Sequence, residues 1–169
     1  MNNSLPDAET LYAELLAQLR SNVKPDTALV GIYTGGVWLA ERLHADLALD
    51  VPLGALDISF YRDDFHQSGI KPDIKRSHIP FDVAGRHILL VDDVLYTGRT
   101  VRGAMNELFD YGRPASIALV VLVDRGGREL PVAAQFVAQT IAVPEGRMLV
   151  LDRDDAGRLS LCFDEESAT

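Results

Sequence analysis

Residues 88–100 read ILLVDDVLYTGRT, and this stretch decides the fold. The four apolar residues that end at Val91 are typical of a strand buried inside a sheet. Two carboxylates side by side, Asp92 and Asp93, follow the apolar run, and Gly98 lies in the loop that precedes a helical pattern. A buried strand, an acidic end, a glycine-bearing loop and a helix indicate a ligand site at the carboxyl edge of a parallel sheet.

Apolar runs typical of strands alternate with helical patterns along the rest of the chain. We expect helices at 7–20, 37–47 and 100–111, and strands at 28–33, 56–61, 87–91, 117–123, 136–143, 148–151 and 159–163. The alternation predicts an α/β fold with a central, mostly parallel sheet, helices on both of its faces and a small hood formed by C-terminal segments.

Two connections are expected to matter for function. Thr34-Gly35-Gly36 predicts a tight loop between a strand and a helix. The polar stretch at about 62–80 is longer than the connections usual in compact domains, which predicts a functional lid or a disordered segment. We expect residues 1–169 to form a single domain with a frayed tail at about 164–169.

The composition argues against several classes of protein. Hydrophobic residues make up 47% of the 169 residues and charged residues 24%, which is ordinary for a globular protein. No apolar run approaches the ~20 residues that span a bilayer, and we expect no signal peptide and no membrane partner. The single cysteine, Cys162, fits a reducing cytoplasm. The formal net charge of −9 argues against nonspecific binding to nucleic acids.

The loop Tyr96-Thr97-Gly98-Arg99-Thr100 has the residue types of a phosphate-binding turn. Its successive backbone N–H groups can converge on one anion at the positive end of the following helix. The preceding carboxylates, Asp92 and Asp93, suit the hydroxyls of a ribose and a hydrated Mg2+ ion. Taken alone, this acidic pair is equally typical of an ordinary α/β sheet edge or of a helix N-cap. The Walker and GxGxxG patterns are absent, which argues against a P-loop or a dinucleotide site.

VDDVLYTGRT at 91–100 resembles the signature of type I phosphoribosyltransferases, which bind phosphoribosyl pyrophosphate. DISFYRDD at 57–64, LYTGRTVR at 95–102 and VLVDRGGRELP at 121–131 resemble the PyrR family, over roughly residues 7–152. The resemblance implies the type I phosphoribosyltransferase fold and a uracil phosphoribosyltransferase, which converts uracil and phosphoribosyl pyrophosphate to UMP and pyrophosphate. Many members also regulate the pyrimidine biosynthetic operon through its leader RNA. We expect a homodimer or a higher homo-oligomer.

The resemblance also implies roles for individual residues. Those expected to bind phosphoribosyl pyrophosphate are Asp92, Asp93, Val94, Leu95, Tyr96, Thr97, Gly98, Arg99 and Thr100. The pyrophosphate loop maps onto Thr34, Gly35 and Gly36, the base site onto Arg125 and the backbone near Leu149, and the lid cations onto Arg62, Lys71, Lys75 and Arg76. Mg2+ is expected near Asp92 and Asp93, held through water and the pyrophosphate. Gly35 stands where the family commonly carries an arginine, and the alternative for Arg125 is a solvent-facing turn charge.

Two differences between this sequence and those of relatives predict the substrate and the RNA partner. Purine-specific relatives place an aspartate at the position of Tyr96, where it handles a proton on the purine N7, so Tyr96 predicts a pyrimidine. RNA-binding relatives carry basic residues and a histidine on the first helix, whereas this chain has Glu14 near that place and Arg20 as the basic residue. We therefore expect weak, salt-sensitive RNA binding at best. The competing hypothesis is a UMP-sensing, RNA-binding attenuation regulator with vestigial catalysis. A basic face on the dimer would favour this hypothesis, whereas the intact phosphate loop argues against it.

Overall fold

The computed structural model describes residues 5–59 and 77–165. These residues contain helices α1 (Ala8–Arg20), α2 (Gly35–Asp46) and α3 (Arg99–Asp110). Their strands are β1 (Ala28–Ile32), β2 (Gly54–Leu56), β3 (His87–Leu95), β4 (Ser116–Asp124), β5 (Phe136–Thr140), β6 (Arg147–Arg153) and β7 (Leu159–Glu165). The expected lid cations Arg62, Lys71, Lys75 and Arg76 lie outside the described residues. Within these residues, no helix has both the length and the hydrophobicity that crossing a bilayer requires.

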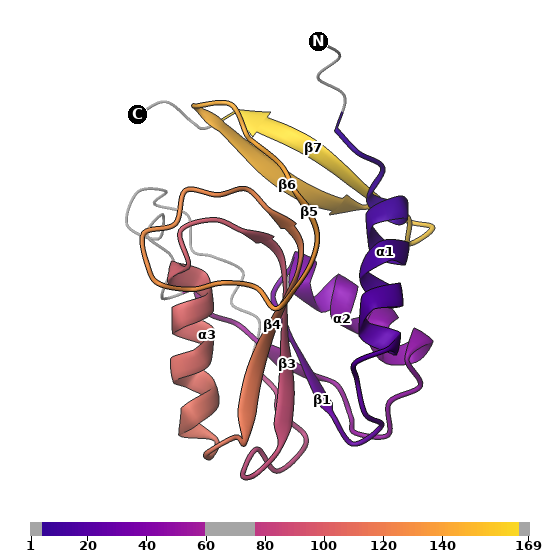
Figure 1. The fold of residues 1–169 in the computed structure, drawn as a ribbon, viewed down its shortest axis with the longest axis vertical. Coiled ribbons are helices and arrows are strands. Elements are labelled where there is room, and N and C mark those ends of the chain that lie inside the picture. Colours follow the sequence, from indigo (N-terminus) through magenta and orange to yellow (C-terminus); the bar gives the residue numbers. More distant parts are fainter. Residues whose placement is uncertain (1–4, 60–76, 166–169) are drawn as a thin grey trace.

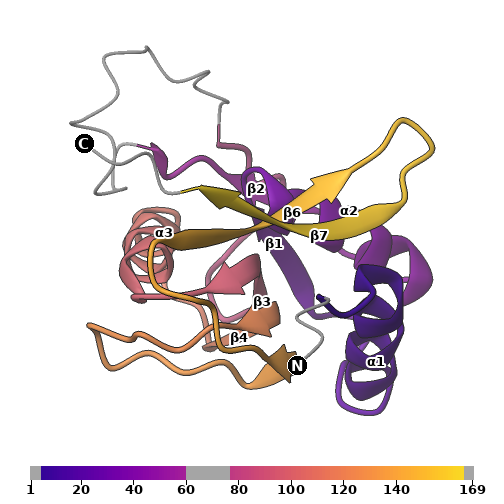
Figure 2. The same ribbon diagram turned by 90° about the horizontal axis from the view of Figure 1, so that it is seen from above.

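In the described part of the chain, five parallel strands form the central sheet, in the order β2-β1-β3-β4-β5. Helices α1 and α2 pack on one face and α3 packs on the other (Figure 1). Strands β6 and β7 pair antiparallel and form a separate hood, which crosses above the carboxyl ends of the central strands (Figure 2). The predicted α/β architecture, with two helical layers and a C-terminal hood, is confirmed.

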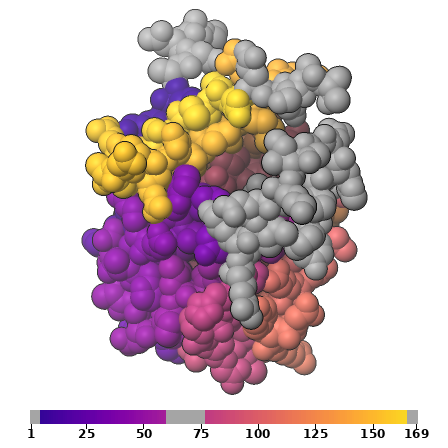
Figure 3. All heavy atoms as spheres, turned by 180° about the vertical axis from the view of Figure 1, so that it is seen from behind, coloured from indigo at the N-terminus to yellow at the C-terminus, as the bar shows by residue number. Residues whose placement is uncertain are grey.

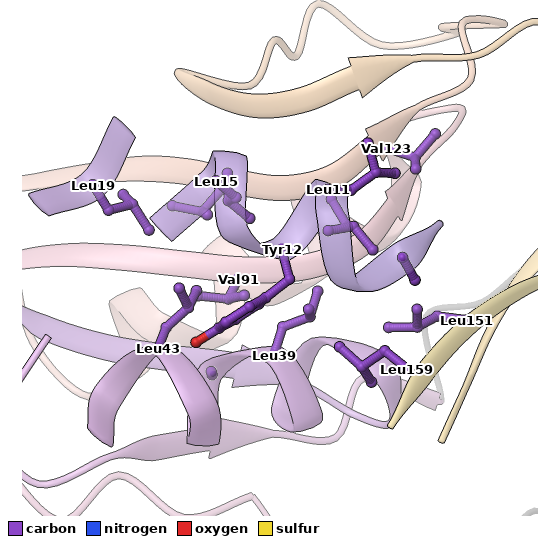
Figure 4. Close-up of a cluster of buried hydrophobic side chains, with 14 of the residues drawn as sticks. Leu11, Tyr12, Leu15, Leu19, Leu39, Leu43, Val91, Val123, Leu151 and Leu159 are labelled. Atoms are coloured by element: carbon purple, nitrogen blue, oxygen red, sulfur yellow. The ribbon is translucent and has the colours of Figure 1, made fainter. Parts of the chain in front are cut away.

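An apolar core joins α1, the sheet and the hood. The four-residue spacing of Leu11, Leu15 and Leu19 places all three on one buried face of α1. Figure 4 shows this stripe beside α2, with Leu151 and Leu159 of the hood in the same cluster. Figure 3 shows the hood lying directly on the segment that contains α2. Because burying one leucine side chain contributes about 1.5–3 kcal/mol, apolar packing is the main attachment of the hood.

The strand expected at 56–61 coincides with the structure at Leu56 alone among the described residues 56–59, and residues 60 and 61 lie outside the described part. Strand β2 occupies Gly54–Leu56, and the chain turns immediately after it. The Asp57 carboxylate accepts a hydrogen bond from the Ser59 N–H at 3.0 Å, while the Asp57 N–H donates to the Ser77 hydroxyl at 2.9 Å. These bonds to side chains replace the ladder bonds that a longer strand would make.

Other strand ends also differ from the expectation. Strand β3 runs to Leu95, so the two acids lie inside it and not beyond it. Strand β5 ends at Thr140, earlier than expected. Strand β7 continues to Glu165, two residues beyond the expected strand, and the rest of the expected frayed tail, 166–169, lies outside the described part.

Charged side chains add a second connection between the N-terminal helices and the hood. Glu9 of α1 accepts two hydrogen bonds from the Arg42 guanidinium of α2, each at 2.9 Å. The same carboxylate accepts a bond from the Leu159 N–H of the hood at 2.7 Å. Arg42 also lies 4.1 Å from the centre of the Tyr12 ring. The hydrogen bond from Arg42 is the largest of the effects that lower the pKa of Glu9 below its ordinary value of 4.5.

Glu9→Gln should lower the free energy of unfolding at pH 7 by about 1 kcal/mol or less, because the ion pair is partly exposed to solvent. Since the pKa of Glu9 is lowered in the folded state, its stabilisation is present above the unfolded-state pKa and is lost as the pH falls through the folded-state value. The difference between the two proteins should therefore shrink below about pH 4. Urea unfolding at pH 7 and pH 3 measures it, and an equal difference at both would show that the charge of Glu9 is not responsible.

Candidate active site

The sheet order places a switch of chain direction between β1 and β3. After β1 the chain moves outward to β2, and it then returns on the other side of β1 as β3. In open parallel sheets, ligands bind outside the carboxyl ends of the strands at such a point. The loop Thr34–Gly36 follows β1 and the loop at 96–100 follows β3, so both predicted loops lie at this edge, below the hood (Figure 2).

The two adjacent acids lie inside β3, where consecutive side chains point to opposite faces of the sheet. Asp93 lies on the α2 side, with its carboxylate against Gly35. Asp92 lies on the α3 side, in register with Val121 of that core, and only 3% of it is exposed. Strand alternation thus separates the charges of these two sequence neighbours. Each carboxylate accepts a bond from the next N–H, Asp92 from Asp93 at 3.0 Å and Asp93 from Val94 at 2.9 Å.

The first turn of α2 packs directly against the end of β3. Helix α2 begins at Gly35, so the tight loop expected at Thr34–Gly36 is largely the first helical turn. A Cβ at Gly36 would meet the Val91 carbonyl oxygen, and a Cβ at Gly35 would overlap the Asp93 carboxylate. Only glycine allows a helix backbone to approach a strand this closely. A side chain at position 35 would therefore displace the Asp93 carboxylate.

The loop after β3 enters α3 through Gly98, whose φ of 92° lies in the left-handed region that favours glycine. The Thr97 hydroxyl accepts a hydrogen bond from the Arg99 N–H at 3.2 Å, which shapes the turn. The hydroxyl hydrogen of Thr97 remains able to donate to a ligand. Because α3 begins at Arg99, the loop ends at the N-terminus of a 12-residue helix, where backbone amides and the helix dipole favour an anion.

Sequence reasoning missed the segment that supports this loop, Arg128–Leu130, which we call the loop brace. Nη1 of Arg128 donates to the Tyr96 carbonyl at 2.6 Å. The N–H groups of the next two residues donate to the Thr97 carbonyl at 3.0 and 3.1 Å. A signal for the segment exists, because it lies in the VLVDRGGRELP stretch that carries the family resemblance.

Arg125 joins the loop to the hood. Its guanidinium stacks on the Tyr96 ring, 4.0 Å from the ring centre. Its Nη2 donates to the Arg147 carbonyl at 3.1 Å and its Nη1 to the Met148 sulfur at 3.6 Å, both in β6. The side chain of the adjacent Leu149 is buried in the core. The structure thus brings Arg125 close to the backbone near Leu149, and Arg125 is not a solvent-facing turn charge.

The acids of this edge fit a metal ion that is held mainly by a substrate. Among the residues that the structure describes, no three His, Cys, Asp or Glu side chains form a group that could hold a metal ion. Mg2+ usually keeps several waters and takes one or two carboxylates together with phosphate oxygens. Asp93, half-buried, supplies a carboxylate beside the first turn of α2.

Known proteins similar to this chain identify its family. Residues 3–144 match the model of the phosphoribosyl transferase domain. A Pseudomonas aeruginosa protein named bifunctional protein PyrR is 50% identical over 144 residues, 83% of this chain and 85% of its own. A Nitrosococcus oceani protein of the same name is 52% identical over 138 residues, 80% of this chain and 78% of its own. This chain belongs to the PyrR family. The prediction of a PyrR-type phosphoribosyltransferase is confirmed.

Solved structures at lower identity confirm the fold. A hypoxanthine-guanine phosphoribosyltransferase of Bacillus anthracis matches with a TM-score of 0.66 at 18% identity, over 84% of this chain and 85% of that chain. A hypoxanthine phosphoribosyltransferase of Trypanosoma cruzi matches with a TM-score of 0.61 at 21% identity, over 93% of this chain and 94% of that chain. The type I phosphoribosyltransferase fold is therefore shared by this PyrR-family chain.

Gly35→Ala should displace the Asp93 carboxylate, because the new methyl group would occupy its position. We expect the free energy of unfolding to fall by about 1–3 kcal/mol, the usual cost of overpacking, and kcat/KM for phosphoribosyl transfer to fall with it. In an Asp93→Ala background the methyl group has room, so the stability cost of Gly35→Ala should largely disappear. Urea unfolding of the four proteins tests this, and strictly additive costs would show that the methyl does not meet Asp93.

Proposed function

We propose that the chain transfers the phosphoribosyl group of phosphoribosyl pyrophosphate to N1 of uracil, forming UMP and pyrophosphate. One observation carries the proposal for this member of the PyrR family. The acidic end of β3, the glycines at the start of α2 and the phosphate loop lie at the same edge of the sheet. The solved structures named as hypoxanthine phosphoribosyltransferases do not indicate the base that this chain uses, because they share only about a fifth of their residues with it.

Each part of this edge takes one part of the donor substrate. The N–H groups at the start of α3, with the Thr97 and Thr100 hydroxyls, hold the 5-phosphate. The loop Thr34–Gly36 holds the pyrophosphate through backbone amides. Asp92 and Asp93 align the ribose hydroxyls from the two sides of the strand end. Mg2+, when bound to pyrophosphate and water, supplies positive charge at the leaving group.

The reaction calls for positioning and charge stabilisation, and it needs no protein nucleophile. Uracil N1 bonds to ribose C1 as the bond from C1 to the pyrophosphate oxygen breaks, through a transition state with oxocarbenium character. Carboxylates beside the ribose stabilise the positive charge that develops, and amide donors stabilise the departing pyrophosphate. The hood above the edge limits access of water, which would otherwise hydrolyse the donor.

Tyr96 and Arg125 form the base end of the site. Tyr96 is 39% exposed and presents a phenol ring where purine-specific relatives present a carboxylate. A pyrimidine lacks the nitrogen whose proton that carboxylate handles, so the substitution removes nothing that uracil needs. Arg125 and the backbone of β6 near Leu149 then provide hydrogen-bond partners for the uracil carbonyls and N3–H.

With phosphoribosyl pyrophosphate as donor, kcat/KM should be highest for uracil. It should be about 100-fold or more lower for hypoxanthine, guanine and orotate, because a site built to hydrogen-bond one base leaves its polar groups unpaired with another. Steady-state assays with the four bases measure this ratio. Tyr96→Asp is the matched variant, and it should raise the relative use of hypoxanthine. Equal or better use of a purine by the wild type would contradict the uracil assignment.

Regulation through RNA is the second function to weigh, because the relatives are named bifunctional. Helix α1 presents Glu9 and Glu14, and Arg20 is its basic residue. With Arg20 as its basic residue, α1 offers little charge for RNA phosphates, which gives no support to a regulator with vestigial catalysis. We place the protein in the cytoplasm as a homodimer or higher homo-oligomer, where the exposed thiol of Cys162 stays reduced.

Binding of pyrimidine-operon leader RNA should be micromolar or weaker at physiological salt, the range of nonspecific binding. Each phosphate that a Lys or Arg neutralises steepens the fall of log binding constant by about 0.7–0.9 per log unit of salt. The few cations on α1 therefore predict a shallow slope. Titrations of the RNA at several salt concentrations, with and without UMP, measure affinity and slope. Nanomolar binding that UMP strengthens would show that the chain has a basic surface elsewhere.

A further inference from the structure

Both carbonyl groups at the start of the phosphate loop are bound from outside the loop. The Tyr96 carbonyl accepts from Arg128 Nη1 at 2.6 Å, and the Thr97 carbonyl accepts from the next two N–H groups of the loop brace at 3.0 and 3.1 Å. Arg128 is itself fixed at further points, since its Nε donates to the Val132 carbonyl at 2.9 Å and its Nη2 to the Asp124 carboxylate. The brace therefore holds the loop by its carbonyl oxygens.

The direction of these carbonyls fixes the direction of the amides that an anion would use. Both peptide units are trans, so the C=O and N–H of each unit point in opposite directions. The Tyr96 carbonyl shares its peptide plane with the Thr97 N–H, and the Thr97 carbonyl shares its plane with the Gly98 N–H. Because the carbonyls point toward the brace, the two N–H groups point away from the brace. The same arrangement keeps the two carbonyl oxygens away from a bound phosphate.

Arg128 acts through the loop and not as a ligand of the phosphate. Its guanidinium is already bonded to two backbone carbonyls and paired with the Asp124 carboxylate. Both side chains of this pair are largely buried, with 24% of Arg128 and 20% of Asp124 exposed. A guanidinium bonded through each of its three nitrogens holds the direction of the loop, while Asp124 balances its charge.

We propose that Arg128 is a positioning residue for the 5-phosphate of the donor substrate, because it sets the polarity of the loop that binds it. The inference rests on the proposed function, in which the loop at 96–100 holds a phosphate. This role accounts for an arginine at position 128. The planar guanidinium bonds three acceptors at once, whereas a lysine could reach one carbonyl but could not bond three acceptors in a plane.

Arg86 provides a matched control for Arg128. It too bonds two backbone carbonyls through its guanidinium, with Nε donating to Asp82 at 3.0 Å and Nη1 to Asp26 at 3.2 Å. It precedes the amino end of β3, whereas Arg128 holds the loop after the carboxyl end. Arg86→Gln therefore removes a similar set of bonds far from the phosphate loop.

The test measures binding of ribose 5-phosphate by calorimetry in the full chain, together with KM for phosphoribosyl pyrophosphate and for uracil. Arg128→Gln and Arg128→Lys should weaken ribose 5-phosphate binding by about tenfold or more and raise KM for the donor similarly, as loss of a charge-assisted hydrogen bond predicts. KM for uracil at saturating donor should change less than about twofold in both. Arg86→Gln should change neither constant, although it should lower Tm.

Asp124→Asn is the second variant, for use if Arg128→Gln does not fold. It keeps the bond from the Gly126 N–H through the Asp124 Oδ1 position but weakens the anchor of Arg128, so it should shift donor binding in the same direction by a smaller factor.

Unchanged ribose 5-phosphate binding in the folded Arg128 variants, or equal weakening by Arg86→Gln, overturns the proposal. Because ribose 5-phosphate contains no base and no pyrophosphate, a wild-type chain that binds it but rejects uracil would overturn the proposed function and not the role of Arg128.

Discussion

The close approach of α2 to β3 is the contact on which the rest of the site depends. Gly35 and Gly36 let the helix backbone reach the strand, so the Asp93 carboxylate lies against the first helical turn. The sheet topology brings the two loops to the same edge, and the glycines let α2 close on β3 there. Because protein interiors are close-packed, a methyl group at either glycine would have to move a neighbour. The geometry of this edge therefore depends on glycine at positions 35 and 36.

Most of the fold could be predicted because its signals are local in the sequence. The leucine spacing of α1 and the apolar run before Asp92 each lie within one element, and both elements form as expected. The pattern misplaces β2 because the residues after Asp57 have high strand propensity, whereas the Asp57 carboxylate turns the chain. The opposite directions of Asp92 and Asp93 are missed because buried carboxylates are rare inside strands.

The contacts that complete the site could not be predicted, because they join residues far apart in the sequence. Arg128 and Tyr96 are separated by 32 positions, and Glu9 and Leu159 by 150. In both pairs one partner is a backbone group, and every residue carries such a group, so the sequence holds no mark of which one is used. The VLVDRGGRELP stretch identifies the brace segment by family resemblance, but it does not identify the carbonyls that the segment binds.

An acidic chain that binds a polyanionic substrate must create its positive site locally. The net charge of −9 repels anions at long range, but at physiological salt this field falls off over about 8 Å. Arg128, which contacts the phosphate loop, adds little local charge because Asp124 neutralises it. Oriented backbone amides therefore supply part of the attraction: the α2 contact positions those of the first turn of α2, and the loop brace orients those of the phosphate loop. Substitutions at this edge should act on the direction of dipoles more than on the amount of charge.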